Sequence, residues 1–305
     1  MNLETITTGF VNHCQGKGLS EHTLRAYKQD LADYQKWIII NKPEDPYSKD
    51  SISGWMLFLQ TKGMAPSSIR RRIACLKVLF RWLDEDGKIN NNPFYRFRAT
   101  VTIPRRLPRN LKAEELKKLL RSPVENQTEN FSRSDLPKHT LKLAIELLFV
   151  TGIRVGELCS IDVTDIDFGE ERITIKGKGN RERIVFIVDL EVKKLLKNYL
   201  KLRQKAKPNT EKLLITTKGN QAHPDYIRRY LHKASKKAGL KRTITPHMLR
   251  HSAATQLLEN GVDIRFVQKL LGHSSISTTE MYTHVSNSSL QKTIKRANTR
   301  GRLGG

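Results

Sequence analysis

Hydrophobic residues in the first hundred positions recur every three or four residues, the spacing of helices with one apolar face. This spacing predicts helices over residues 6–13, 21–38, 52–59 and 66–83. Ser20 is suited to cap the second helix, and Pro66 is suited to the first turn of the fourth. We therefore predict an N-terminal unit of four helices with its aromatic residues in the core. A basic patch on it, Arg70, Arg71 and Arg72, either contacts phosphates or is simply solvated.

A stretch rich in proline and arginine separates this unit from the rest of the chain. Pro104 and Pro108 disfavour a helix there, and the arginines between them suit a path along a phosphate backbone. Helical spacing resumes at Leu111. The predicted division is a helical domain over 1–102, a linker over 103–110, a second domain over 111–286 and a tail over 287–305. We expect the tail to contact a neighbouring protomer and then to end in disorder.

The second domain combines two periodicities. Helical spacing predicts a helix over 138–150 and a short one over 155–160. Alternation of apolar and polar residues over 165–187 predicts a three-stranded antiparallel meander, with Lys176–Asn180 as the turn between the last two strands. The polar stretch 122–137 is predicted to be a loop, and the chain after the meander is predicted to be mainly helical. The expected fold class is mainly α with a small β-meander, an α+β arrangement.

The charge is unusually positive and unevenly distributed. The chain carries 55 Lys and Arg against 30 Asp and Glu, a net charge of +25. Residues 1–103 contribute +5 and residues 104–305 contribute +20. A field of this size attracts polyanions, so nucleic acid is the expected partner, with binding that weakens steeply in salt. Charge alone does not separate an enzyme from a basic binding protein.

Several classes of protein are disfavoured by features that the sequence lacks. No apolar run approaches the roughly 18 residues that span a bilayer, and the N-terminus lacks a signal-peptide pattern. We therefore expect a cytoplasmic, nucleoid-associated protein without a membrane partner. Cys14, Cys75 and Cys159 are far apart and lack metal-ligand spacing, so we expect buried thiols and neither metal nor cofactor.

Six separated residues are suited to act on a phosphate group. Each one taken alone also has an ordinary structural explanation, such as a surface arginine, a solvated turn lysine or a core tyrosine. Four lie within helix-start or turn sequences, and two follow in the last fifty residues. The candidates are Arg154, Lys178, His247, Arg250, His273 and Tyr282.

The order of the surrounding motifs resembles the tyrosine recombinase family, in particular its Xer-type members. The motifs are TGIRVGEL, KGKGNRER, PHMLRHSAAT and LLGHSSISTTEMYTHV. The resemblance covers residues 110–286, and the N-terminal unit is similar, less specifically, to the family's SAM-like core-binding domain. It implies a two-domain, C-shaped clamp on DNA.

The resemblance also implies a role for each candidate. Tyr282 would attack the scissile phosphate, Arg154, Arg250 and His273 would stabilise the charge, His247 would accept a proton and Lys178 would protonate the leaving 5′-oxygen. Lys176 is the less favoured choice for the lysine. Glu157 would orient Arg154, with a surface salt bridge as the alternative. His251 and His284 are read as supporting hydrogen-bonding residues.

The implied activity is site-specific recombination through a 3′-phosphotyrosyl intermediate, without metal or ATP. The implied partners are double-stranded DNA with a recombination site and a homotetramer of the chain; accessory proteins, and the choice between dimer resolution and mobile-element integration or excision, stay open. The alternatives are type IB topoisomerase-like relaxation and non-catalytic DNA binding. The candidate DNA contacts are Arg70, Arg71, Arg72, Arg105, Arg106 and Arg109.

Overall fold

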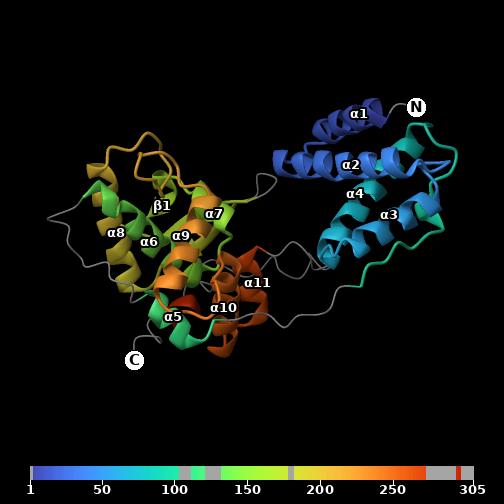
Figure 1. The fold of residues 1–305 in the computed structure, drawn as a ribbon. Coiled ribbons are helices and arrows are strands. Elements are labelled where there is room, and N and C mark those ends of the chain that lie inside the picture. The colour runs from blue at the N-terminus through green and yellow to red at the C-terminus, as the bar shows by residue number, and fades with distance from the viewer. Residues whose placement is uncertain (1–2, 103–110, 121–131, 178–181, 273–292, 297–305) are drawn as a thin grey trace. The chain divides into compact units, whose positions relative to one another are not determined.

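The computed structural model describes residues 3–102, 111–120, 132–177, 182–272 and 293–296. The chain divides into two compact units between Arg106 and Leu107 (Figure 1). Each unit has its own hydrophobic core. No helix within the described residues is long and apolar enough to cross a membrane.

The first unit contains the four predicted helices. They are α1 (Leu3–Gly16), α2 (Glu21–Asn41), α3 (Lys49–Thr61) and α4 (Pro66–Glu85), followed by a 3₁₀ turn, Pro93–Tyr95. Ser20 caps α2 by accepting a hydrogen bond from the N–H group of Thr23, as its type and position indicate. Tyr34, Trp55 and Phe80 are fully buried, so the predicted aromatic core is confirmed.

The basic patch of α4 is partly paired within this unit. Asp30, on α2, is buried and forms ion pairs with Arg71 and Arg72. Arg72 also pairs with Asp33 at 2.7 Å, and its side chain is mostly buried. A buried carboxylate needs such partners because desolvation of an unpaired charge is costly. Two of the three predicted DNA-contacting arginines of α4 therefore have a structural role in this unit.

The second unit packs helices around a small sheet. Its helices are α5 (Ala113–Leu120), α6 (Leu136–Thr151), α7 (Val155–Ser160), α8 (Leu190–Lys205), α9 (Pro224–Lys237), α10 (Pro246–Glu259) and α11 (Ile264–Leu271), with 3₁₀ turns at Arg133–Asp135 and Val163–Asp165. The strands β1 (Ile166–Asp167), β2 (Arg172–Lys176) and β3 (Glu182–Phe186) form the predicted antiparallel meander in the order β1-β2-β3. The fold class is confirmed.

Two predicted elements differ from the structure. The predicted loop over 122–137 is wrong at its end, because Pro137 lies in the first turn of α6, where a proline costs no hydrogen bond. Residues 121–131 lie outside the described residues. The chain between α8 and α9 is also not helical, and Leu213, Leu214 and Ile215 within it are fully buried. The hydroxyl oxygen of Tyr199, on α8, accepts a hydrogen bond from the backbone N–H of Ile215, so that buried backbone group has a partner.

Helix α6 is the centre of the second unit. It is buried along most of its length and packs against α7, α8, α9 and α10. Of the predicted tail, residues 293–296 are described. Ile294 is buried in the core of its own unit, and Lys295 pairs with Glu171 at 2.7 Å. The tail's predicted contact with another protomer stays a prediction.

Candidate active site

Arg154 lies in the turn between two helices. Gly152 ends α6 in the left-handed backbone region (φ 63°), which glycine adopts without strain. Arg154 then precedes α7 in an extended conformation, and 44% of its side chain is exposed. The junction of α6 and α7 thus presents a guanidinium group to solvent from a fixed backbone.

Glu157 holds this arginine from one helical turn further along. Its Oε1 accepts hydrogen bonds from Nη1 of Arg154 (2.9 Å) and Nη1 of Arg183 (3.0 Å). Its Oε2 accepts the backbone N–H of Arg154 (2.7 Å) and Nη2 of Arg183 (2.8 Å). Burial would raise the pKa of Glu157, but these hydrogen bonds outweigh it and hold the pKa below its ordinary value. The carboxylate is therefore ionised, and its four acceptor positions are filled.

Arg250, on α10, lies beside this cluster and is almost completely buried. Its Nη1 donates to the carbonyl oxygen of Gly152 and its Nη2 to that of Leu271, both at 2.7 Å. Burial, together with the nearby charge of Arg154, lowers the pKa of Arg250 to about 10. The side chain thus stays charged at neutral pH, and backbone carbonyls fix its orientation.

The C-terminus of α11 connects the arginines of the site. Three consecutive carbonyl oxygens at this end each accept a hydrogen bond from a different arginine. Leu270 accepts from Arg183 (3.0 Å), Leu271 from Arg250 (2.7 Å) and Gly272 from Arg154 (3.2 Å). The last carbonyls of a helix lack intrahelical partners and carry partial negative charge, so they bind cations well. One helix end therefore sets the positions of three guanidinium groups that come from three different elements.

The histidines of α10 lie at its exposed start. Thr245 caps the helix by accepting a hydrogen bond from the backbone N–H of Met248, and Pro246 lies in the first turn, as predicted. Partial burial of the His247 ring lowers its pKa, and the charges of His251 and Arg250 add to the effect. His247 is therefore neutral at pH 7 and able to accept a proton. His251 is exposed one turn later.

Lys176, the less favoured candidate for the lysine, is engaged in a structural ion pair. Its ammonium group contacts Asp162 at 3.2 Å and Asp165 at 3.0 Å. Its hydrogen bonds to these carboxylates raise the pKa of Lys176, which makes it a weaker proton donor. The other predicted residues Lys178, His273, Tyr282, His284, Arg105, Arg106 and Arg109 lie outside the described residues.

The sequence interpretation missed Arg183, which lies in the middle of this site. A signal for it was present in the meander. Arg183 pairs in register with Ile175, and Ile173 and Ile175 are the inward-facing residues of β2. Residues directly opposite on antiparallel strands share a face, so an arginine at 183 had to point inward and find a partner there.

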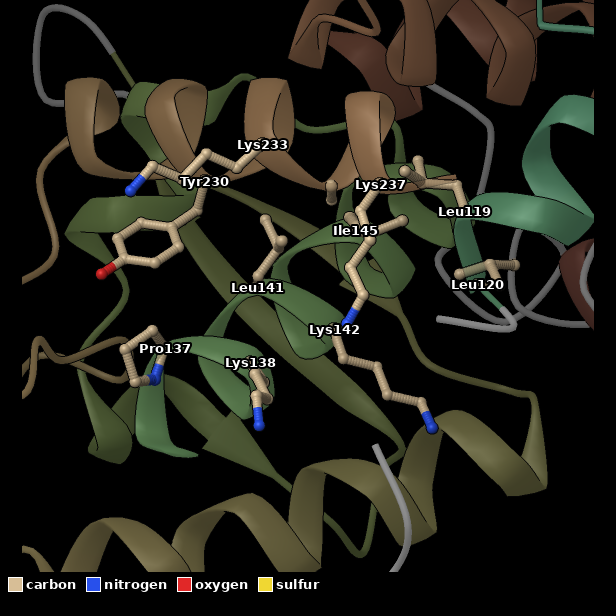
Figure 2. Close-up of a pocket in the computed structure, with 11 residues that line it drawn as sticks. Leu119, Leu120, Pro137, Lys138, Leu141, Lys142, Ile145, Tyr230, Lys233 and Lys237 are labelled. Carbon is tan, nitrogen blue, oxygen red and sulfur yellow. The ribbon is translucent and has the colours of Figure 1, made fainter. Parts of the chain in front are cut away.

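An apolar groove lies elsewhere on the second unit, between α5, α6 and α9. It has a volume of about 190 Å³, and its apolar lining includes Leu119, Leu141 and Ile145. Figure 2 shows lysines from α6 and α9 around it, with Tyr230 at one side. None of the arginines of the site lines this groove, so it is a separate feature of the surface.

Comparison with known proteins covers both units. The model of the phage integrase family matches residues 109–289, and that of the phage integrase N-terminal SAM-like domain matches residues 8–87. Tyrosine recombinase XerC of Thermodesulfovibrio yellowstonii is 36% identical over 296 residues, which cover 93% of each chain. A crystal structure of XerH site-specific recombinase bound to difH substrate is 25% identical, with a TM-score of 0.64 over 86% of this chain and 77% of that chain. A lambda integrase tetramer bound to a Holliday junction is 23% identical, with a TM-score of 0.69 over 91% of this chain and 76% of that chain.

The chain belongs to the phage integrase family, and its relatives in that family are tyrosine recombinases. It is a site-specific DNA recombinase, an enzyme that cleaves and rejoins DNA. The predicted family, fold class and type of activity are thereby confirmed. The topoisomerase-like and non-catalytic alternatives are not favoured.

Proposed function

We propose that Arg154 and Arg250 bind the scissile phosphate of DNA and that Tyr282 attacks it. The observation that carries this proposal is the fixing of both guanidinium groups on adjacent carbonyls, Leu271 and Gly272, of one helix end. Two forked donors held on one rigid element suit the non-bridging oxygens of a phosphodiester. They are preorganised for the charge that develops in a pentavalent transition state.

The remaining roles follow from what the reaction requires. The phenol of Tyr282 loses its proton as it attacks phosphorus, and neutral His247 accepts or relays that proton. The bond to the 5′-oxygen breaks, and Lys178 protonates the leaving oxygen. His273 adds a donor to the phosphate. The product is a 3′-phosphotyrosyl link and a free 5′-hydroxyl, so a second strand can reverse the step without ATP.

We propose further that the enzyme binds double-stranded DNA at a defined site and acts as a tetramer. The net charge of +25 supports DNA binding, and the fold is shared with a lambda integrase that forms a tetramer on a Holliday junction. The same proposal places the enzyme in the cytoplasm, associated with the nucleoid. It divides the chain into domains over 1–102 and 111–286, joined by a linker over 103–110. It also assigns a protomer contact to residues 287–305.

Covalent trapping tests the proposed chemistry. The full-length protein would be incubated with a library of nicked duplexes, resolved under denaturing conditions and digested for mass spectrometry. We expect a DNA-linked peptide whose modified residue is Tyr282, joined to a 3′-phosphate. A link through another residue, or the absence of any link on fragments that the protein binds, would refute the proposal.

The pH dependence of cleavage tests the role of His247. Its pKa is lowered, so the neutral form persists as the pH falls to 6.5, and cleavage should be lost only below that value. Arg154, Arg228 and Arg250, which face His247, keep their charge over this range. Initial cleavage rates between pH 5 and 8 would be compared with those of His247→Gln and His251→Gln. The loss at low pH should disappear in the first variant and remain in the second; the opposite result would assign the proton to His251.

A further inference from the structure

Arg183 fills the space between the sheet and the arginines of the site. It is the second residue of β3, and its side chain is 16% exposed. Nε donates to the carbonyl oxygen of Leu270, and Nη1 and Nη2 donate to the two oxygens of Glu157. Every nitrogen of its guanidinium group therefore has a partner within the protein. Arg183 differs in this from Arg250, whose Nε donates to no group within the described residues.

The close approach of Arg183 to α11 depends on a glycine. Gly272 ends α11 with φ 63°, and a Cβ atom there would lie 3.3 Å from atoms of the Arg183 guanidinium group. The absence of a side chain at 272 lets this guanidinium group lie against the helix end. Its contacts thus join three elements: β3, the start of α7 and the end of α11.

We infer that Arg183 is a positioning residue, which holds Glu157 and the end of α11 so that Arg154 is oriented to bind phosphate. The inference rests on the proposed function of Arg154. Glu157 is the link, because it binds Arg183 and Arg154 with two hydrogen bonds each. When Arg183 shares the charge of Glu157, less of the positive charge of Arg154 is neutralised.

The arrangement also connects the β2–β3 hairpin with the site. Arg183 follows Lys178 by five residues and is anchored to the same helix end as Arg154 and Arg250. A shift of this hairpin would therefore move Glu157 and disturb Arg154. Hydrogen bonds to one helix end thus link the sheet with the two arginines proposed to bind phosphate.

Removal of this guanidinium group should slow cleavage without weakening DNA binding. In Arg183→Gln, Glu157 loses two charged hydrogen bonds and draws Arg154 toward itself. We expect the cleavage rate to fall by about 100-fold, the effect of a small misplacement of a reacting group. The DNA dissociation constant should stay within about twofold of that of the wild type, because one of 55 basic residues changes. Arg183→Lys keeps the positive charge but loses the planar, paired N–H donors of the guanidinium group, so it should retain only part of the wild-type cleavage rate.

A second measurement needs neither DNA nor activity. With ¹³C-labelled glutamate, the Glu157 carboxyl signal, assigned by its absence in Glu157→Gln, can be titrated in the full chain. The pKa of Glu157 should rise in Arg183→Gln, because burial then outweighs the remaining bonds from Arg154. Arg172→Gln is the matched control: Arg172 is an exposed arginine on β2, paired with Asp167 at 3.3 Å. It should change neither the rate nor the pKa of Glu157.

The outcomes separate this inference from the proposed function. Wild-type cleavage through Tyr282 together with an unchanged rate in Arg183→Gln would overturn the positioning role alone. An unchanged pKa of Glu157 in Arg183→Gln would overturn the coupling, whatever the activity. In a Glu157→Gln background, Arg183→Gln should lower the rate little further, since both changes break the same link. Full additivity, or a loss that merely follows lowered stability in urea, would make Arg183 an ordinary structural residue.

Discussion

Replacement of Arg250 by alanine is expected to lower the rate of DNA cleavage by about 10³-fold, the usual effect of removing one preorganised donor to a developing negative charge. Arg250 is 7% exposed, and two backbone carbonyls from α6 and α11 fix it. In the proposed role, its donors to the phosphate are therefore oriented before DNA binds, and a solvated lysine or arginine elsewhere would not replace them. The measurement is the single-turnover cleavage rate on a nicked duplex that the wild type cleaves, with Tyr282→Phe as the inactive control.

The chain offers a close control for this variant. Arg203, on α8, is 8% exposed and also donates to two backbone carbonyls, those of Lys212 and Thr210. Both alanine variants leave carbonyl groups unpaired, so both should lose about 1–3 kcal/mol of stability per group. Only Arg250→Ala should lose cleavage activity when both proteins are compared while folded. Equal losses of activity would show that Arg250 acts through stability rather than through the phosphate.

The helices were predictable because their signals are local. The spacing of apolar residues in α2 and α4, the cap at Ser20 and the proline at 66 all lie within a few residues of what they determine. The meander was predictable for the same reason. The buried run Leu213–Ile215 was not, because its backbone partners lie in distant segments such as α8. An apolar run of this length fits a buried helix or a buried strand equally well.

The candidate site was predictable only in part. Motifs indicated Arg154, Glu157, His247 and Arg250. The structure brings Arg154, Glu157 and Arg250 together through direct hydrogen bonds or through their shared helix end. The role of the α11 carbonyls could not be predicted, since it joins residues about 120 positions apart in the chain. Arg183 was overlooked because a strand arginine beside a basic turn looks like a solvated charge until the register of the strand is considered.

Replacement of Gly152 by alanine should destabilise the second unit by about 2–5 kcal/mol. Two costs add at this position. The left-handed backbone at φ 63° costs an L-residue about 1–2 kcal/mol, and a new methyl group in a packed core costs about 1–3 kcal/mol. The Cβ atom would lie 2.5 Å from Cδ2 of Leu271, which is buried, so this side chain must shift and the packing between α6 and α11 is disturbed. Urea unfolding followed by far-UV circular dichroism measures the loss.

The position of the tryptophans makes this experiment specific to one unit. All three, Trp37, Trp55 and Trp82, lie in the first unit, so tryptophan fluorescence should report an unchanged transition while circular dichroism reports the loss in the second. Gly239→Ala is the matched control, because Gly239 has φ 66° and a Cβ atom there would contact no other part of the described structure within 4 Å. It should show the backbone cost alone, about 1–2 kcal/mol.

The difference in stability between these two variants measures the contact of the new methyl group with Leu271. Leu271→Ala should therefore remove that difference. Because the carbonyls of Gly152 and Leu271 both bind Arg250, a disturbance of the packing between α6 and α11 should also slow cleavage in the folded protein. A Gly152→Ala protein with the stability of Gly239→Ala and full cleavage activity would show that this junction does not set the position of Arg250.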